Sequence, residues 1–137
     1  MGPVRETKLT LRFNGDDLDP EELSERLGAV PTSAVAKGEV WLTANGAERV
    51  AATGSWRLRV AGASSEDLDD QINRLFGGLT PSCETWRDLA ARYQGNLFVG
   101  LFLGSSNEGL TIKPDTAQAV GARGLELQLD IYGTDLA

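Results

Sequence analysis

The fold is decided by the stretch Asn96-Leu-Phe-Val-Gly-Leu-Phe-Leu103, which is apolar on both of its faces. Successive residues of a β-strand point to opposite faces of a sheet, so the aliphatic side chains of this stretch share one face. Phe98 and Phe102 lie on the other face. A strand of this kind is covered at least in part on both sides. The stretch therefore predicts a strand inside a sheet.

Three other segments alternate apolar and polar residues, as strands with one buried face do. These segments are 8–13, 55–60 and 125–132. Shorter strands are predicted at 38–42 and 110–113. The segment 43–54, which is rich in Ala, Gly, Asn and Thr, is predicted to be a loop.

The clearest helix start follows the first of these strands. Asp19 fits the N-cap, Pro20 the first helical position and Glu22 the third, where each residue type is favoured. Gly28 supplies the left-handed residue that ends many helices. These signals agree with one another, so a short helix is predicted between Asp19 and Gly28.

Three more helices are predicted from start and stop signals, which are Ser64 with Asp67 before Gly77-Gly78, Thr80-Pro81, and Pro114-Asp115. Helices scattered among strands, with hairpins rather than only crossovers, indicate an α+β fold. We predict a two-layer sandwich related to the ferredoxin-like fold. Its helices pack on one face of a mostly antiparallel sheet of about six strands. Residues 1–137 are predicted to form a single domain.

The composition excludes several classes of function. The 137 residues include no histidine and one cysteine, which removes histidine-based catalytic triads and histidine-containing zinc sites. The formal net charge of −7 opposes phosphate backbones, so nucleic acid is not expected as a partner. The longest apolar run, 97–103, is too short to span a membrane, and the first residues lack a secretory signal. A lone cysteine suits a reducing compartment, so a cytoplasmic location is expected.

Two groups of residues that could belong to a binding site are explained by the fold instead. Trp41, Trp56 and Trp86 fall at inward strand or helix positions and are predicted to anchor the core. The aspartates at positions 16, 17 and 19 would suit a hard cation, but their spacing does not complete a calcium-binding loop. One of them is also the predicted helix cap. No metal or cofactor is therefore expected.

The candidate binding residues lie on the sheet face opposite the aliphatic row. If helices cover that row, Phe98 and Phe102 are left on an open face beside the polar side of the last strand. An aromatic patch ringed by charge is typical of an interaction surface. The candidate residues are Phe98, Phe102, Asp130, Tyr132, Arg57 and Arg59.

Two plainer interpretations of this face stay open. In the first interpretation, the charged side chains of this face, which include Lys8 and Arg12, form cross-strand ion pairs on a solvated surface. Alternatively, a loop such as 43–54 folds over the aromatic residues and buries them.

Several short motifs together resemble the bacterial domain-of-unknown-function family 4279. They are Gly15-Asp16-Asp17-Leu18-Asp19-Pro20, Leu27-Gly28 with Pro31-Thr32, Lys37-Gly38-Glu39, Gly54-Ser55-Trp56, Asn107 and Leu129-Asp130-Ile131-Tyr132. The resemblance covers about residues 9–133 and implies a single small domain with no assigned catalytic residue. The small residues of 42–52 depart from the family pattern, which has a more polar link there.

The leading functional hypothesis is a non-enzymatic cytoplasmic domain that binds a protein partner through the open face. An immunity-like antitoxin is one form of this hypothesis. The alternative is a small polar ligand-binding protein, or an enzyme that works with carboxylates and without histidine. That alternative uses Asp130, Tyr132, Arg57 and Arg59. The sequence leaves the oligomeric state open.

Overall fold

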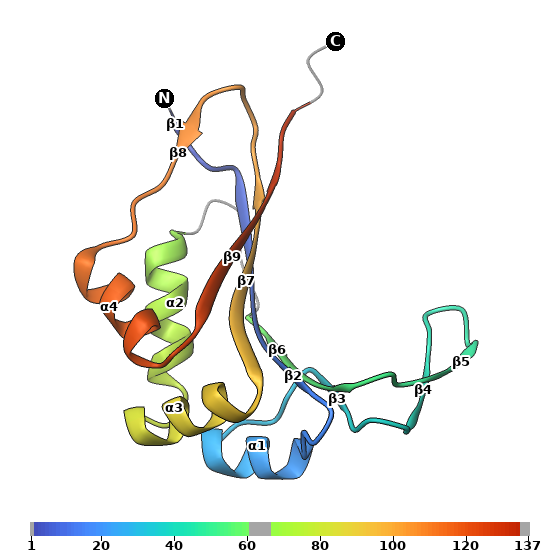
Figure 1. Cartoon of the computed structure of the whole chain (residues 1–137). Coiled ribbons are helices and arrows are strands. Elements are labelled where there is room, and N and C mark those ends of the chain that lie inside the picture. Colours follow the sequence, from blue (N-terminus) through green and yellow to red (C-terminus); the bar gives the residue numbers. More distant parts are fainter. Residues whose placement is uncertain (1, 61–66, 135–137) are drawn as a thin grey trace.

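The computed structural model of this chain describes residues 2–60 and 67–134, and its centre is a five-stranded sheet (Figure 1). The strand order is β3-β6-β2-β7-β9. The strands are β2 (Glu6–Gly15), β3 (Ser33–Val35), β6 (Gly54–Arg59), β7 (Gln94–Phe102) and β9 (Glu126–Tyr132). Neighbouring strands are antiparallel, except that β9 runs parallel to β7.

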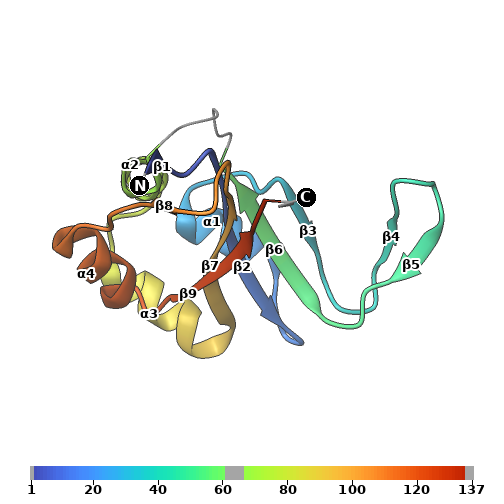
Figure 2. The ribbon, with the colours of Figure 1, turned by 90° about the horizontal axis from the view of Figure 1, so that it is seen from above.

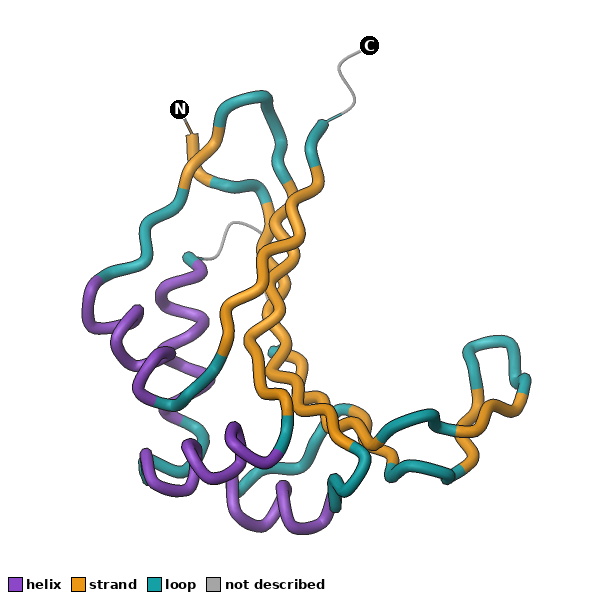
Figure 3. Tube along the Cα trace, in the orientation of Figure 1, coloured by secondary structure: helices purple, strands orange, loops and turns teal. Residues whose placement is uncertain are grey.

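Four helices lie on one side of this sheet (Figure 3). They are α1 (Pro20–Leu27), α2 (Leu68–Gly77), α3 (Cys83–Arg92) and α4 (Pro114–Ala122). The view from above places no helix of the described residues on the opposite side (Figure 2). The predicted α+β class, with helices on one sheet face, is confirmed.

Two short strand pairs lie outside the main sheet. β1 (Gly2–Pro3) pairs with β8 (Glu108–Gly109), and β4 (Val40–Leu42) pairs with β5 (Glu48–Val50) as a hairpin that projects from the body (Figure 1). The main sheet therefore has five strands rather than about six. The prediction that 43–54 is only a loop is wrong, because β5 lies within it.

The predicted starts of the helices are largely confirmed. The Asp19 side chain accepts a hydrogen bond from the Glu21 N–H, and Gly28 ends α1 with φ of +78°. Asp67 caps α2, while the predicted contribution of Ser64 lies outside the described residues. The cap of α3 is Ser82 rather than the predicted Thr80-Pro81 pair, because the Ser82 side chain accepts from the helix.

The core fills the space between the sheet and the helices. Phe13 of β2 lies between two tryptophans, with ring centroids 6.3 Å from Trp56 and 6.4 Å from Trp86. Both indole rings are fully buried, as predicted. Their N–H groups are satisfied, because Trp56 donates to the Ser24 hydroxyl and Trp86 donates to the Thr80 carbonyl. Buried polar groups without such partners destabilise a fold.

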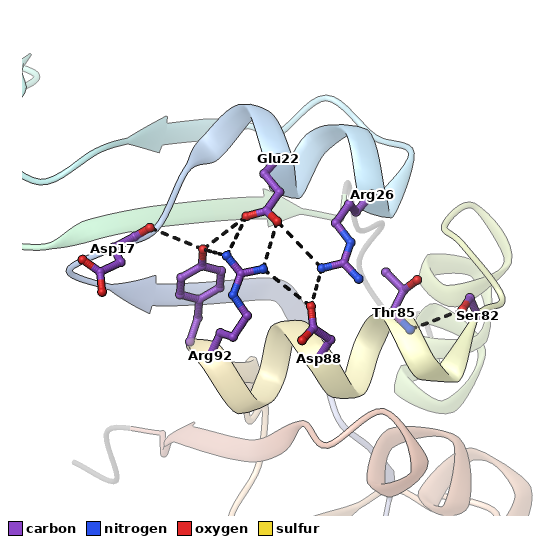
Figure 4. A network of polar contacts seen from close by, with 8 residues as sticks. Asp17, Glu22, Arg26, Ser82, Thr85, Asp88 and Arg92 are labelled. Carbon is purple, nitrogen blue, oxygen red and sulfur yellow. Dashed lines mark hydrogen bonds and ion pairs between the residues drawn. The ribbon is translucent and has the colours of Figure 1, made fainter.

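A network of charged side chains joins α1 to α3 (Figure 4). The guanidinium of Arg92 donates to both oxygens of Glu22, at 2.9 Å each, and this lowers the pKa of the Glu22 carboxyl. Arg26 of α1 makes a close ion pair with Asp88 of α3. Single exposed ion pairs contribute little, but paired bonds of this geometry fix how two helices lie together.

A second polar link joins α2 to α4. The Asp69 carboxylate accepts a hydrogen bond of 2.8 Å from the backbone N–H of Lys113, which directly precedes α4. Asn73 donates to the Thr116 hydroxyl at 2.9 Å, and both Asp69 and Thr116 are buried. Because α4 leads directly into β9, this link helps to set the position of that strand.

This link predicts a pH dependence of stability. The hydrogen bond from the Lys113 N–H holds the pKa of Asp69 below its ordinary value of 3.8. A lowered folded-state pKa stabilises the protein above the unfolded-state pKa, and this contribution is lost as the pH falls through the folded-state value. Asp69→Asn is therefore expected to melt at a lower temperature than wild type at pH 7.

The difference in melting temperature between Asp69→Asn and wild type is expected to narrow as the pH falls from about 5 through the lowered folded-state pKa of Asp69. Thermal unfolding followed by circular dichroism measures it. Glu48→Gln, an exposed side chain of the β4–β5 hairpin, is the matched control and should track wild type throughout. A constant difference for Asp69→Asn at every pH would contradict this role of the Asp69 charge.

Candidate functional site

The sheet face away from the helices, called here the open face, carries aromatic and charged side chains in register. Thr10 of β2 pairs with Phe98 on one side and with Arg59 on the other. Phe102 pairs with Tyr132 of β9. The open face comprises Glu6, Lys8, Thr10, Arg12, Arg57, Arg59, Asn96, Phe98, Phe102, Glu126, Gln128, Asp130 and Tyr132. All six predicted site residues thus lie on one face.

One end of the open face is an aromatic stack. The rings of Phe102 and Tyr132 lie parallel, with centroids 4.7 Å apart and an interplanar angle of 2°. The Lys8 ammonium lies 5.1 Å from the centre of the Phe102 ring. The Tyr132 hydroxyl donates to Asp130 at 2.7 Å, and this bond raises the pKa of Tyr132. Tyr132 is half exposed, so the stack is accessible.

The middle of the open face is held by Arg12. Its guanidinium lies 4.2 Å from the centre of the Phe98 ring, in the geometry of a cation–π contact. It also donates to Asn96 and to Gln128, at 2.9 Å each, and so reaches from β2 across β7 to β9. Burial and the nearby charge of Arg57 both lower the pKa of Arg12. The cation is thus fixed in place by neutral groups.

Arg57 and Arg59 add two exposed cations to this face. In the described part of the chain, neither forms an ion pair with a carboxylate, and the same holds for Lys8 and Arg12. The cross-strand ion pairs of the plainer interpretation are therefore missing from the described residues of this face. Four cations lie on this face, and within the described ranges its carboxylates, Glu6, Glu126 and Asp130, form no ion pair with them.

Two hollows lie in the open face, and Phe98 lines both. The smaller, of about 180 Å³, is lined by three arginines, Arg12, Arg57 and Arg59. The larger, of about 390 Å³, extends towards Phe102 and Tyr132. No residue of 43–54 lines either hollow, so that segment does not cover the aromatic residues. Phe98 and Phe102 are partly exposed.

The prediction that Trp41 anchors the core is wrong, because its side chain is 46 % exposed. Trp41 lies in the β4–β5 hairpin, where it pairs with Arg49 rather than with a strand of the main sheet. It lines a third hollow, of about 320 Å³, together with Ser55 and Arg57. Trp41 thus extends the candidate site beyond the predicted residues. The run Val40-Trp41-Leu42, apolar on both faces yet flanked by small and polar residues, is the sequence signal for it.

Other candidate features are placed as follows. Cys83 begins α3, and its side chain is exposed. Within the described ranges, no group of three or more His, Cys, Asp or Glu side chains is placed to hold a metal ion. No helix among the described residues has the length and apolar character needed to cross a membrane.

The hydrogen bond between Tyr132 and Asp130 can be measured directly. Replacing Asp130 with Asn removes the negative charge that keeps the Tyr132 proton bound, so the pKa of Tyr132 should fall towards its ordinary value of 10. Ultraviolet absorbance of tyrosinate against pH follows this, with Tyr132→Phe to identify the signal and separate it from that of Tyr93. Superimposable titrations of wild type and Asp130→Asn would contradict the bond.

A comparison with family models matches this chain to one family, described as a domain of unknown function (DUF4279), over residues 5–134. No curated protein and no solved structure matches the chain. The predicted relation to the ferredoxin-like fold therefore stays a prediction. The family match spans nearly all of the sequence and confirms the resemblance seen in its motifs, so this chain belongs to the DUF4279 family.

Proposed function

We propose that this chain is a non-enzymatic interaction domain that binds a protein partner through the open face. The observation that carries this proposal is the gathering of cations, none in an ion pair among the described residues, around partly exposed aromatic rings. Interfaces are enriched in aromatic residues and arginine, which combine a large contact area with directed hydrogen bonds. The helices leave this face free for such contacts.

The charge of the open face indicates the kind of partner. The whole chain carries 20 acidic and 13 basic residues, yet the open face has four basic residues against three acidic ones. Three of the basic residues, Arg12, Arg57 and Arg59, line one hollow and make the middle of the face basic. A surface of this sign attracts carboxylates and repels other basic surfaces. The partner is therefore an acidic protein surface, with apolar side chains that contact Phe98 and Phe102.

The shape of the open face also favours a protein partner. Small-molecule sites are enclosed cavities of roughly 300–1,000 Å³ that surround most of the ligand. The hollow between the three arginines, of about 180 Å³, is below this range, and the hollow beside Tyr132, of about 390 Å³, is within it but open to solvent. A small polar ligand, the alternative, would have to bind between Arg12, Arg57 and Arg59 with one side left in solvent.

The cellular setting is part of the same proposal. We place the interaction in the cytoplasm, because a chain with a single cysteine cannot form the internal disulfides that oxidising compartments favour. An immunity-like role is one form of the proposal, with a toxin as the acidic partner. In that role the domain needs no catalytic residue, because binding alone blocks the partner.

The experiment is native mass spectrometry of the tagged protein isolated gently from the cells that produce it. Wild type is expected to carry an additional mass of protein size. The double variant Phe98→Ala, Phe102→Ala and the variant Arg57→Glu are expected to lose that mass while remaining folded. The double variant should melt at a somewhat lower temperature, because both rings lose their contacts with Arg12, Lys8 and Tyr132. Val30→Ala is the control, since Val30 is 86 % exposed between α1 and β3.

Retention of the partner by the folded Phe98→Ala, Phe102→Ala variant would contradict the proposal. An additional mass of a few hundred daltons would instead support the small polar ligand. In that case Asp130→Asn and Arg57→Glu should release the ligand, and unchanged binding by both would show that this site is misplaced as well.

A further inference from the structure

The outer edge of the sheet at β9 exposes an aliphatic row. Leu127, Leu129 and Ile131 are 38 %, 50 % and 57 % exposed, although they share a face with the buried residues Leu97 and Val99 of β7. β9 is the last strand of its sheet, so its outer edge has no partner strand among the described residues. A long apolar edge strand left uncovered is a template for pairing with another chain.

The backbone N–H and C=O groups of the same three residues of β9 point away from the sheet. The Tyr132 carbonyl accepts a hydrogen bond from the Leu103 N–H, so the polar groups of Tyr132 face β7. The direction of these groups alternates from residue to residue along a strand. The backbone groups of Ile131, Leu129 and Leu127 therefore point away from the sheet, ready to pair with another strand.

We propose that a second copy of this chain pairs with β9, antiparallel, about a two-fold axis at Leu129. Leu129 then lies opposite Leu129 of the other copy, and Leu127 lies opposite Ile131. The three outward-facing residues of each copy all form hydrogen-bonded pairs in this register. Their side chains meet on the helix side of the sheet, where aliphatic contact removes them from water.

The charges of β9 select this register over its neighbours. With the axis at Leu129, Gln128 faces Asp130 and Glu126 faces Tyr132 of the other copy, so no carboxylate lies directly opposite another carboxylate. An axis at Gln128 would place Glu126 against Asp130, and an axis at Asp130 would place that residue against itself. Like charges directly opposite each other destabilise a strand pair. The sequence Glu126-Leu-Gln-Leu-Asp-Ile-Tyr132 is thus complementary to itself in one register.

The dimer would join two open faces into one surface. A two-fold axis perpendicular to the sheet keeps the helices of both copies on one side and both open faces on the other. The continuous sheet would run β3-β6-β2-β7-β9 and then back through the second copy. The Phe102–Tyr132 stacks would lie close to the axis, so a symmetric or elongated partner would meet both.

Cysteine crosslinking tests the pairing and its register together, in a Cys83→Ser background that removes the native thiol. Opposed residues of a hydrogen-bonded antiparallel pair have Cα atoms about 5.5 Å apart, which a disulfide can span. Leu129→Cys is therefore expected to form a crosslinked dimer on mild oxidation. Leu127→Cys alone is not, since its two copies would lie roughly 13 Å apart. A mixture of Leu127→Cys with Ile131→Cys is expected to crosslink.

The control for random collision is Val30→Cys, which is more exposed than any residue of the row. Leu129→Cys that crosslinks no faster than Val30→Cys would overturn the proposal. Crosslinking of Leu127→Cys with itself, together with no crosslinking in its mixture with Ile131→Cys, would overturn the register. All four variants replace exposed side chains, and thermal unfolding shows whether each is folded before the result is used.

Sedimentation equilibrium provides a measurement without crosslinks. Wild type is expected to dimerise with increasing concentration, and Leu129→Lys to dissociate at least about tenfold more easily because two ammonium groups would meet at the axis. Val30→Lys adds the same charge elsewhere and should behave as wild type. A wild-type chain that stays monomeric up to millimolar concentration would overturn the proposal, and would leave the open face and its partner untouched.

Discussion

The antiparallel pairing of β2 with β7 is the contact on which the rest of the structure depends. Leu9 lies opposite Val99 and Leu11 lies opposite Leu97, and all four side chains are fully buried under the helices. Because residues alternate between faces, this register also decides what remains on the other side. A shift by one residue would move the aliphatic row into solvent and the charged row into the core.

The open face is ordered by cations rather than by a second layer of helices. Arg12 contacts Phe98 and bonds to residues of β7 and β9, so one side chain ties three strands together. The Lys8 ammonium makes a similar cation–π contact with the Phe102 ring. Cation–π contacts and stacking hold these rings in defined positions while leaving much of their surface accessible. A surface prepared in this way loses little conformational freedom on binding.

Local sequence signals predicted a large part of this arrangement. The alternation in β2, β6 and β9 and the cap at Asp19 depend on neighbours within a few positions, and the structure has each of them. The grouping of the six candidate residues on one face follows from this alternation once the strands pair in register. The misassigned features depend on distant contacts. Trp41 is exposed because its hairpin stands apart from the sheet, and Leu129 is half exposed because β9 is an edge. No periodicity in the sequence distinguishes an edge strand from a covered one.

The central claim is that the open face is the surface that meets a protein partner. Hydroxyl-radical footprinting compares the same side chains in the purified protein and inside the cells that produce it. The account predicts that oxidation of Phe98, Phe102 and Tyr132 is strongly reduced in the cells, relative to the purified protein, while α1–β3 loop residues such as Val30 react equally in both. Equal oxidation of the three aromatic rings in both settings would contradict the account.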